Sequence, residues 1–341
     1  MKLSYETILK IAQGAARIEE HDGYVCFYRF TKAQEELYCS VKEDFYNKTF
    51  ATAGVRLAFK TNSERLSLSA LFKQASSRTY FSVDVAVNGK IIGSLDNCGG
   101  GEVFFENERE NYPLGEFCGE FSLGEGEKEV VIYLPWSCTA RVSELSLDDG
   151  AFVLPLSREK KLLVFGDSIT QGYCAVHPSG RYAALLADAL GAEERNKAIG
   201  GEIFRPELAE LREEDAYEPD YITVAYGTND WGVSSDREKT VAKFRGFYEA
   251  LAKNYPNTKI FAIAPIWRGD AKKRKCVYGD FSLVAKDIKE VVSDIENITF
   301  IDAYDCVPES ESFFADLYLH PNDAGFDHYA KNLTNKIKQF I

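Results

Sequence analysis

No apolar run in this sequence approaches the roughly 20 residues that a transmembrane helix requires. The N-terminal segment, residues 1–7, also lacks the apolar stretch of a secretory signal, so we expect a cytoplasmic protein that makes no membrane contact. The eight cysteines are scattered and no two have C-x-x-C spacing, which argues against a zinc site or a redox pair. In a cytoplasmic protein they would be reduced thiols, and no metal or organic cofactor is expected.

Positive charge is in short supply, because 40 lysine and arginine residues face 53 aspartate and glutamate residues. The formal net charge of −13 would repel phosphates, so we do not expect a nucleic acid partner. Solubility alone would explain the acidity. With 341 residues, 45% of them hydrophobic, the chain has room for two domains, and nothing in the sequence indicates an oligomeric state.

The N-terminal part shows the period-two alternation of half-buried strands. After one short helix predicted over residues 5–14, several segments alternate apolar residues with polar or small ones. The dipeptide Asn88-Gly89 lies between residues 83–87 and the apolar pair at 91–92, and it predicts a hairpin. Many short strands without a long helix are typical of an all-β sandwich, which we take as jelly-roll-like and assign to residues 1–156. The alternating segments are residues 55–59, 65–71, 81–87 and 130–134.

The pattern changes after residue 156, where continuous apolar segments alternate with amphipathic helical patterns. This order predicts a parallel sheet that is covered on both faces by helices, over residues 157–341. The predicted strands are residues 162–165, 221–225, 260–263 and 298–301, and the predicted helices are residues 181–190, 238–253, 281–295 and 323–340.

The first of these strands runs directly into a Gly-Asp-Ser turn that carries Ser168. A serine there lies at the carboxyl end of a parallel strand, where open α/β sheets bind their ligands. Taken alone, the turn is explained as well by a serine that only satisfies backbone groups.

Four segments in order resemble the sequence blocks of the SGNH (GDSL-like) serine hydrolases. Residues 166–172 (GDSITQG) resemble block one, residues 196–201 resemble block two, residues 227–230 (GTND) resemble block three, and residues 320–322 (HPN) resemble block five. The resemblance covers roughly residues 160–341 and implies a flavodoxin-like three-layer α/β/α domain with serine esterase activity. A sandwich followed by such a domain is also similar, in architecture only, to carbohydrate esterase family 2.

The resemblance implies a role for each block. Ser168 would be the nucleophile, and His320, one of only four histidines, would be the general base that takes its proton. The backbone N–H groups of Ser168 and Gly201 and the side-chain amide of Asn229 would form the oxyanion hole. Glycine at position 201 would let the backbone approach the substrate closely.

The acid of the triad departs from the family pattern. The family's aspartate lies three residues before the histidine, where this chain has Leu317, whereas Asp316 lies four residues before His320. We predict Asp316 as the acid, reached through a small bulge. A backbone carbonyl that orients His320 and Asp323 are the alternatives, although Asp323 is better explained as the N-cap of the last helix.

Four further residues are candidate substrate contacts. Asp167 precedes the nucleophile, His177 follows it in the next loop, and Trp231 and Trp267 follow predicted strands and could wall a pocket. Core packing is the competing interpretation of both tryptophans. We predict hydrolysis of a carboxyl ester through an acyl-serine, with a short acyl group such as acetyl, in a small-molecule or carbohydrate substrate. A lipase or thioesterase for longer chains, or a catalytically silent carbohydrate-binding protein, remain alternatives.

Overall fold

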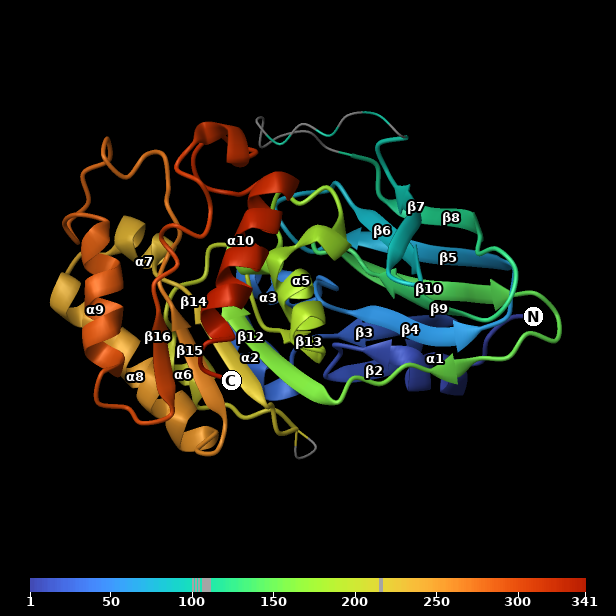
Figure 1. Ribbon diagram of the computed structural model, residues 1–341, viewed down its shortest axis with the longest axis horizontal. Coiled ribbons are helices and arrows are strands. Elements are labelled where there is room, and N and C mark those ends of the chain that lie inside the picture. The colour runs from blue at the N-terminus through green and yellow to red at the C-terminus, as the bar shows by residue number, and fades with distance from the viewer. Residues whose placement is uncertain (100, 102, 104, 106–111, 215–216) are drawn as a thin grey trace.

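The computed structural model describes residues 1–99, 101, 103, 105, 112–214 and 217–341. Two antiparallel sheets occupy one end of the elongated molecule, and a parallel sheet flanked by helices occupies the other (Figure 1). We call residues 1–155 the β region and residues 160–341 the α/β region. The change from antiparallel to parallel sheet falls between β11 (Leu154–Pro155) and β12 (Lys160–Gly166).

The sheets of the β region enclose a common apolar core, as expected of a sandwich. One sheet has the order β1-β4-β9-β6-β7 with β11 on β4, and the other has the order β2-β3-β10-β5-β8. Buried side chains such as Phe59, Leu68 and Val83 fill the space between the sheets. The strands are β1 (Ala12–Gln13), β2 (Arg17–His21), β3 (Tyr24–Tyr28), β4 (Arg56–Thr61), β5 (Arg65–Gln74), β6 (Ser82–Val87), β7 (Lys90–Asp96), β8 (Gly115–Ser122), β9 (Lys128–Tyr133) and β10 (Cys138–Leu147).

The hairpin predicted at Asn88-Gly89 is confirmed and joins β6 to β7. Both residues have positive φ, 49° and 77°, which a two-residue turn between twisted strands requires.

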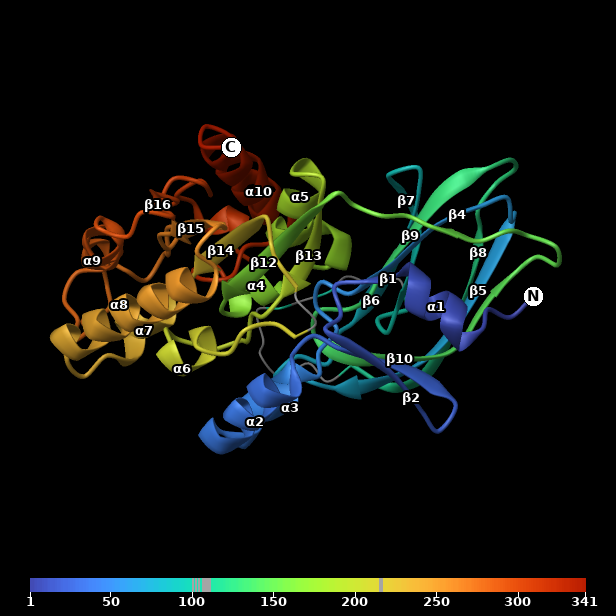
Figure 2. The ribbon, with the colours of Figure 1, turned by 90° about the horizontal axis from the view of Figure 1, so that it is seen from below.

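The expectation that this region is all-β is wrong in one respect. Besides α1 (Tyr5–Ile11), which was predicted, it contains α2 (Lys32–Val41) and α3 (Glu43–Thr49). The start of α2 has a capping box, in which Thr31 and Gln34 satisfy each other's backbone N–H groups. Figure 2 shows that α2 and α3 leave the sandwich and lie beside the α/β region. They bury Tyr38 in the core of that region rather than in the sandwich.

The parallel sheet has the order β13-β12-β14-β15-β16, which is the flavodoxin-like order predicted. Helices α5 and α10 pack on one face and α8 and α9 on the other, which makes three layers. The described part of the chain has no helix that is both long enough and apolar enough to span a membrane. The remaining strands are β13 (Ala192–Asn196), β14 (Tyr221–Ala225), β15 (Lys259–Ile263) and β16 (Ile298–Ile301). The helices are α4 (Ser168–Gln171), α5 (Tyr182–Ala189), α6 (Pro206–Ala209), α7 (Thr228–Val233), α8 (Arg237–Asn254), α9 (Ser282–Val292) and α10 (Asp323–Ile337), with 3₁₀ turns at Pro178–Gly180 and Glu311–Phe313.

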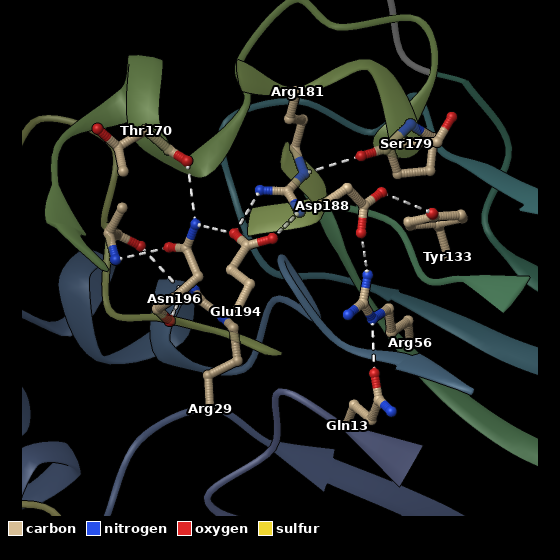
Figure 3. Close-up of polar contacts among 12 residues, drawn as sticks. Gln13, Arg29, Arg56, Tyr133, Thr170, Ser179, Arg181, Asp188, Glu194 and Asn196 are labelled. Atoms are coloured by element: carbon tan, nitrogen blue, oxygen red, sulfur yellow. Dashed lines mark hydrogen bonds and ion pairs between the residues drawn. The ribbon is translucent and has the colours of Figure 1, made fainter. Parts of the chain in front are cut away.

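Buried polar groups join the two regions (Figure 3). Arg29 of the β region is fully buried and donates to the carbonyl oxygens of Asn196 and Ala198, at 2.8 and 3.1 Å, just after β13. Asn196 in turn donates to the carbonyl of Thr170, at 3.1 Å, and to Glu194, at 2.8 Å. Because buried polar groups are costly unless they are paired, these bonds fix the ends of β12 and β13 against the β region.

Candidate active site

Ser168 stands where β12 passes into the short helix α4. Asp167 is the N-cap of that helix, and its carboxylate accepts the N–H of Ile169 at 3.0 Å. A Cβ at Gly166 would lie only 2.1 Å from Thr170 Oγ1, so the tight passage from strand to helix requires glycine. The turn therefore presents the Ser168 hydroxyl at the carboxyl edge of the sheet, with 6% of the residue exposed.

A line of hydrogen bonds runs from Ser168 to Asp316. His320 Nε2 lies 2.8 Å from Ser168 Oγ, and His320 Nδ1 lies 2.7 Å from Asp316 Oδ2. The alternative in which a backbone carbonyl orients His320 is wrong, because Asp316 accepts from Nδ1. Asp323 is likewise not the partner, because its Oδ1 accepts the N–H of Val176 at 2.9 Å.

The extra residue between Asp316 and His320 is accommodated by a turn at Leu317. Leu317 has φ of 66°, in the left-handed region that non-glycine residues seldom adopt. The turn lets Asp316 Oδ1 accept the backbone N–H groups of Tyr318, Leu319 and His320, at 3.2, 2.8 and 3.0 Å. The bulge predicted from the sequence spacing is thus a closed turn around one carboxylate oxygen.

The surroundings of Asp316 keep its carboxylate ionised. Burial alone would raise its pKa, but the hydrogen bond and charge of His320, with the backbone N–H groups of Leu319 and His320, lower the pKa to about 2. An ionised acceptor at Nδ1 fixes the ring with Nε2 towards Ser168 and stabilises the imidazolium that forms during proton transfer.

The predicted oxyanion groups lie at the ends of neighbouring strands. Ser168 follows β12, Gly201 follows β13 with φ of 87°, and Asn229 lies in the first turn of α7 after β14. Asn229 Nδ2 donates to the carbonyl of Glu202 at 2.9 Å, which ties the Asn229 helix to the Gly201 loop. Their role as oxyanion donors stays a prediction, and the three strands that they follow, β13, β12 and β14, are neighbours in the sheet.

The β region reaches this site through Trp136, which sequence reasoning missed. Its indole lies 5.0 Å from the ring of Tyr173, and Tyr173 stacks on His320 at 5.7 Å. Trp136 Nε1 donates to the carbonyl of Ala175, and its own carbonyl accepts from Gln171, both at 2.9 Å. The loop after Ser168 is thereby held by a residue 35 to 39 positions earlier in the chain, in a segment without a local motif.

The Gly201 loop is held by the β region as well. Lys48 of α3 donates to the carbonyl of Gly200 at 2.9 Å, and Gln171 accepts the N–H of Gly200 at 2.8 Å. The nearest atom to a Cβ built on Gly201 belongs to Phe45 of α3, at 3.6 Å. Helix α3 therefore forms one wall beside the predicted oxyanion glycine, and no pattern in the sequence indicated this.

Two of the predicted substrate contacts are wrong. Trp231 is fully buried and donates from Nε1 to the carbonyl of Gly279, so it packs in the core below the site. Asp167 is 2% exposed and caps α4, and its burial raises its pKa to about 7. The N-cap assigned to Asp323 is wrong too, because Asn322 accepts the N–H of Gly325 at 3.0 Å.

The other two candidates lie near the surface. His177 is half-exposed and hydrogen-bonds Asp84 of β6 at 2.9 Å, and Trp267 packs beside Phe314 at 5.2 Å. Their contact with substrate stays a prediction.

Within the described ranges, no cluster of three His, Cys, Asp or Glu side chains has the arrangement of a metal site.

Comparison with known proteins agrees with this geometry. Residues 164–328 match the GDSL-like Lipase/Acylhydrolase family. No curated protein sequence matches the chain. Among solved structures, a salicylyl-acyltransferase from a tetracycline biosynthetic pathway is similar at a TM-score of 0.79 and 20% identity, over 96% of this chain and 94% of that chain.

Two further structures share the fold over most of their length. A protein of Bacteroides ovatus ATCC 8483, named as a GDSL-like lipase, has a TM-score of 0.75 and 18% identity, over 99% of this chain and 97% of its own. A family two carbohydrate esterase from Clostridium thermocellum, in complex with cellohexaose, has a TM-score of 0.62 and 20% identity, over 85% and 93%. At these identities the likeness establishes the fold, including the pairing of a β region with an α/β region.

Proposed function

We propose, from the premise that the α/β region of this chain belongs to the GDSL-like lipase/acylhydrolase family, that this serine esterase removes short acyl groups from carbohydrate esters. The observation that carries the esterase activity is the unbroken line of hydrogen bonds from Ser168 through His320 to Asp316. An alcohol oxygen is a poor nucleophile until a base takes its proton, and this line supplies both the base and the group that orients it.

The reaction would proceed in two steps. Ser168 Oγ attacks the ester carbonyl carbon while His320 Nε2 takes its proton, and the N–H groups at Ser168, Gly201 and Asn229 stabilise the oxyanion. The C–O bond to the alcohol then breaks, the alcohol leaves with the proton from His320, and the acyl group stays on Ser168. Water attacks the acyl-serine in the same manner and His320 takes its proton. The bond between the acyl carbon and Ser168 Oγ then breaks, Oγ regains the proton from His320, and the carboxylic acid is released.

A short acyl group suits the surroundings of Ser168. Four cavities of 430 to 670 Å³ are lined by other residues, so none of these is an acyl tunnel that begins at Ser168. The space beside Gly201 is limited by Phe45, and the cavity lined by Asp167 and Ile169 holds only about 20 Å³. The carbohydrate part of the proposal is supported by the similar fold of the cellohexaose-bound esterase.

The test is a series of 4-nitrophenyl esters of increasing acyl length, assayed beside acetylated oligosaccharides. We expect kcat/KM to be highest for acetate and to fall as the chain lengthens, with release of acetate from the acetylated sugars. Ser168→Ala should turn over none of them. A maximum at long acyl chains would favour a lipase or thioesterase, and binding of the sugars without turnover would favour a carbohydrate-binding protein.

A further inference from the structure

Arg78 places a positive charge beside Tyr173, a neighbour of the catalytic histidine. It lies on the loop between β5 and β6, is half-buried, and holds its guanidinium carbon 5.8 Å from the ring centre of Tyr173. The same ring stacks on His320. The β region therefore contributes a cation as well as Trp136 to the surroundings of the catalytic pair.

This guanidinium is not neutralised within the described part of the chain. Its Nε is buried and has no hydrogen-bond partner there, and no described carboxylate lies within ion-pair distance of it. Such a group is costly to bury unless something else satisfies it. Most other buried and half-buried arginines pair with a carboxylate, whereas Arg29 bonds to backbone carbonyls and Arg141 forms no ion pair with a described residue. The pairs are Arg17–Glu35, Arg56–Asp188, Arg181–Glu194, Arg195–Glu213, Arg205–Glu202 and Arg268–Asp270.

A second source of positive charge lies in the α/β region, whereas Arg78 belongs to the β region. Residues 272–275 read Lys-Lys-Arg-Lys, are all exposed, and belong to the loop that follows β15. This loop contacts the segment between Asp316 and His320, because the N–H of Gly269 donates to the carbonyl of Tyr318 at 2.8 Å. It also contacts the Asn229 helix, because Arg274 donates to the carbonyl of Gly232 at 3.2 Å.

These bases stand out in a chain with a net charge of −13. Lys272, Arg274 and Lys275 line a cavity of about 670 Å³, in which Asp280 is the one acidic lining residue. Bases that flank a crevice raise the local concentration of anions and steer them towards it. Two separate parts of the chain thus present positive charge to the same edge of the sheet.

We propose that the ester substrate carries a carboxylate apart from its ester bond, as in an acylated acidic sugar, and that Arg78 binds this carboxylate. The inference rests on the proposed esterase activity and narrows its substrate class. A planar guanidinium offers a carboxylate two parallel hydrogen bonds, which fixes orientation as well as charge. Residues 272–275 then attract the substrate without holding it in one position.

The test compares two acetyl esters, 4-acetoxybenzoate and its methyl ester, in which a methyl group masks the negative charge, and release of acetate is measured for both. The quantity measured is the ratio of their kcat/KM values, in wild type and in Arg78→Gln. We expect Arg78→Gln to lower the anionic-to-neutral ratio of kcat/KM roughly 10- to 100-fold, the scale of a hydrogen-bonded charge pair. The ratio for Arg78→Lys should lie between those of wild type and Arg78→Gln. The ratio in wild type should also fall as ionic strength rises.

Arg141→Gln is the matched control, because Arg141 is also half-buried with an unpartnered Nε but lies on β10 within the sandwich. It should leave the ratio at its wild-type value. Equal changes for both esters in Arg78→Gln would indicate a structural role and overturn the inference, as would an unchanged ratio. Binding of the two compounds to Ser168→Ala, with and without Arg78→Gln, gives the same comparison without turnover. An inactive wild type that still binds the anionic compound through Arg78 would contradict the esterase proposal alone.

Discussion

The position of Asp316 illustrates what single residues decide in this site. Its spacing of four from His320 departs from the family pattern, yet the left-handed turn at Leu317 brings its carboxylate to His320 Nδ1. The sequence offered three partners for the histidine, and only the turn geometry distinguishes them. For Trp231 the predicted substrate contact is wrong. A large aromatic residue beside a motif fits a pocket wall and a core position equally well, and Trp231 lies in the core.

Replacing Asp316 with Asn should lower kcat steeply, by up to about 10⁴-fold as in better-known serine triads, since an amide at Nδ1 favours the wrong tautomer of His320. KM should change far less. Asp323→Asn is the matched control, because its carboxylate accepts from Val176 rather than from the triad, and it should remain within a few-fold of wild type. An Asp316→Asn enzyme as active as this control would remove Asp316 from the mechanism.

At the scale of elements, the strands that sequence patterns predict are those whose side chains meet apolar neighbours. β13 escaped prediction because its inward residues are Glu194 and Asn196, which are buried through bonds to Arg181, Arg29 and Thr170. An apolar pattern cannot reveal a strand whose interior contacts are polar. Helices α2 and α3 were missed because their buried side chains pack on the distant α/β region.

The contact between Trp136 and the loop after Ser168 predicts that the β region positions catalytic groups. Trp136→Phe removes the bond to the Ala175 carbonyl and loosens the support of Tyr173 and His320. We expect kcat to fall by up to about 100-fold, the effect of a small misplacement, with a much smaller change in KM. Phe72→Leu, in the sandwich core, is the control for lost stability and should leave kcat unaltered. Equal effects of the two variants on kcat would refute a positioning role.

The contact between His177, in the loop after Ser168, and Asp84 of β6 should make the stability of the fold depend on pH. The hydrogen bond between His177 and Asp84 raises the pKa of His177, and despite burial the bonds from His177 and Ser179 lower the pKa of Asp84. The stabilisation of the folded state by this pair is complete between about pH 4 and 6.5, which are the ordinary pKa values of Asp and His. It is lost as pH rises through the folded pKa of His177 or falls through that of Asp84.

His177→Gln should therefore cost more stability near pH 6 than near pH 9, as measured by urea denaturation. His328→Gln is the control, since the contact recorded for His328 is with the ring of Phe313 rather than with a carboxylate. A loss for His177→Gln that is the same at both pH values would show that the ion pair does not join the regions.

For the whole molecule, the sequence predicted two regions of different pattern but not how closely they depend on each other. The buried guanidinium of Arg29 donates to backbone carbonyls of both regions. Lys197 of the α/β region forms an ion pair with Glu213 and also donates to Gln34 of the β region. Burial of this kind follows from contacts between distant segments, which no local pattern encodes. The site therefore lies in an α/β region whose shape is completed by the β region.

Removing residues 1–155 should give an α/β region that is poorly soluble or inactive towards 4-nitrophenyl acetate. The deletion exposes the apolar surface that Phe30 and Tyr38 cover, and it removes the bonds from Lys197 to Gln34 and from Arg29 to the carbonyl of Asn196. The comparison is with the full chain at equal concentration, by circular dichroism and activity. A soluble deletion variant with full activity would show that the α/β region needs no support from the rest.

The most direct test of the central claim is to label the folded enzyme with a fluorophosphonate and locate the adduct by peptide mass spectrometry. We predict one adduct per chain on Ser168, formed at the same rate as esterase activity is lost. Asp316→Asn should slow the labelling in proportion to its loss of kcat. Complete loss of activity with the adduct on another residue, or full activity after Ser168 is labelled, would contradict the assignment of Ser168 as the nucleophile.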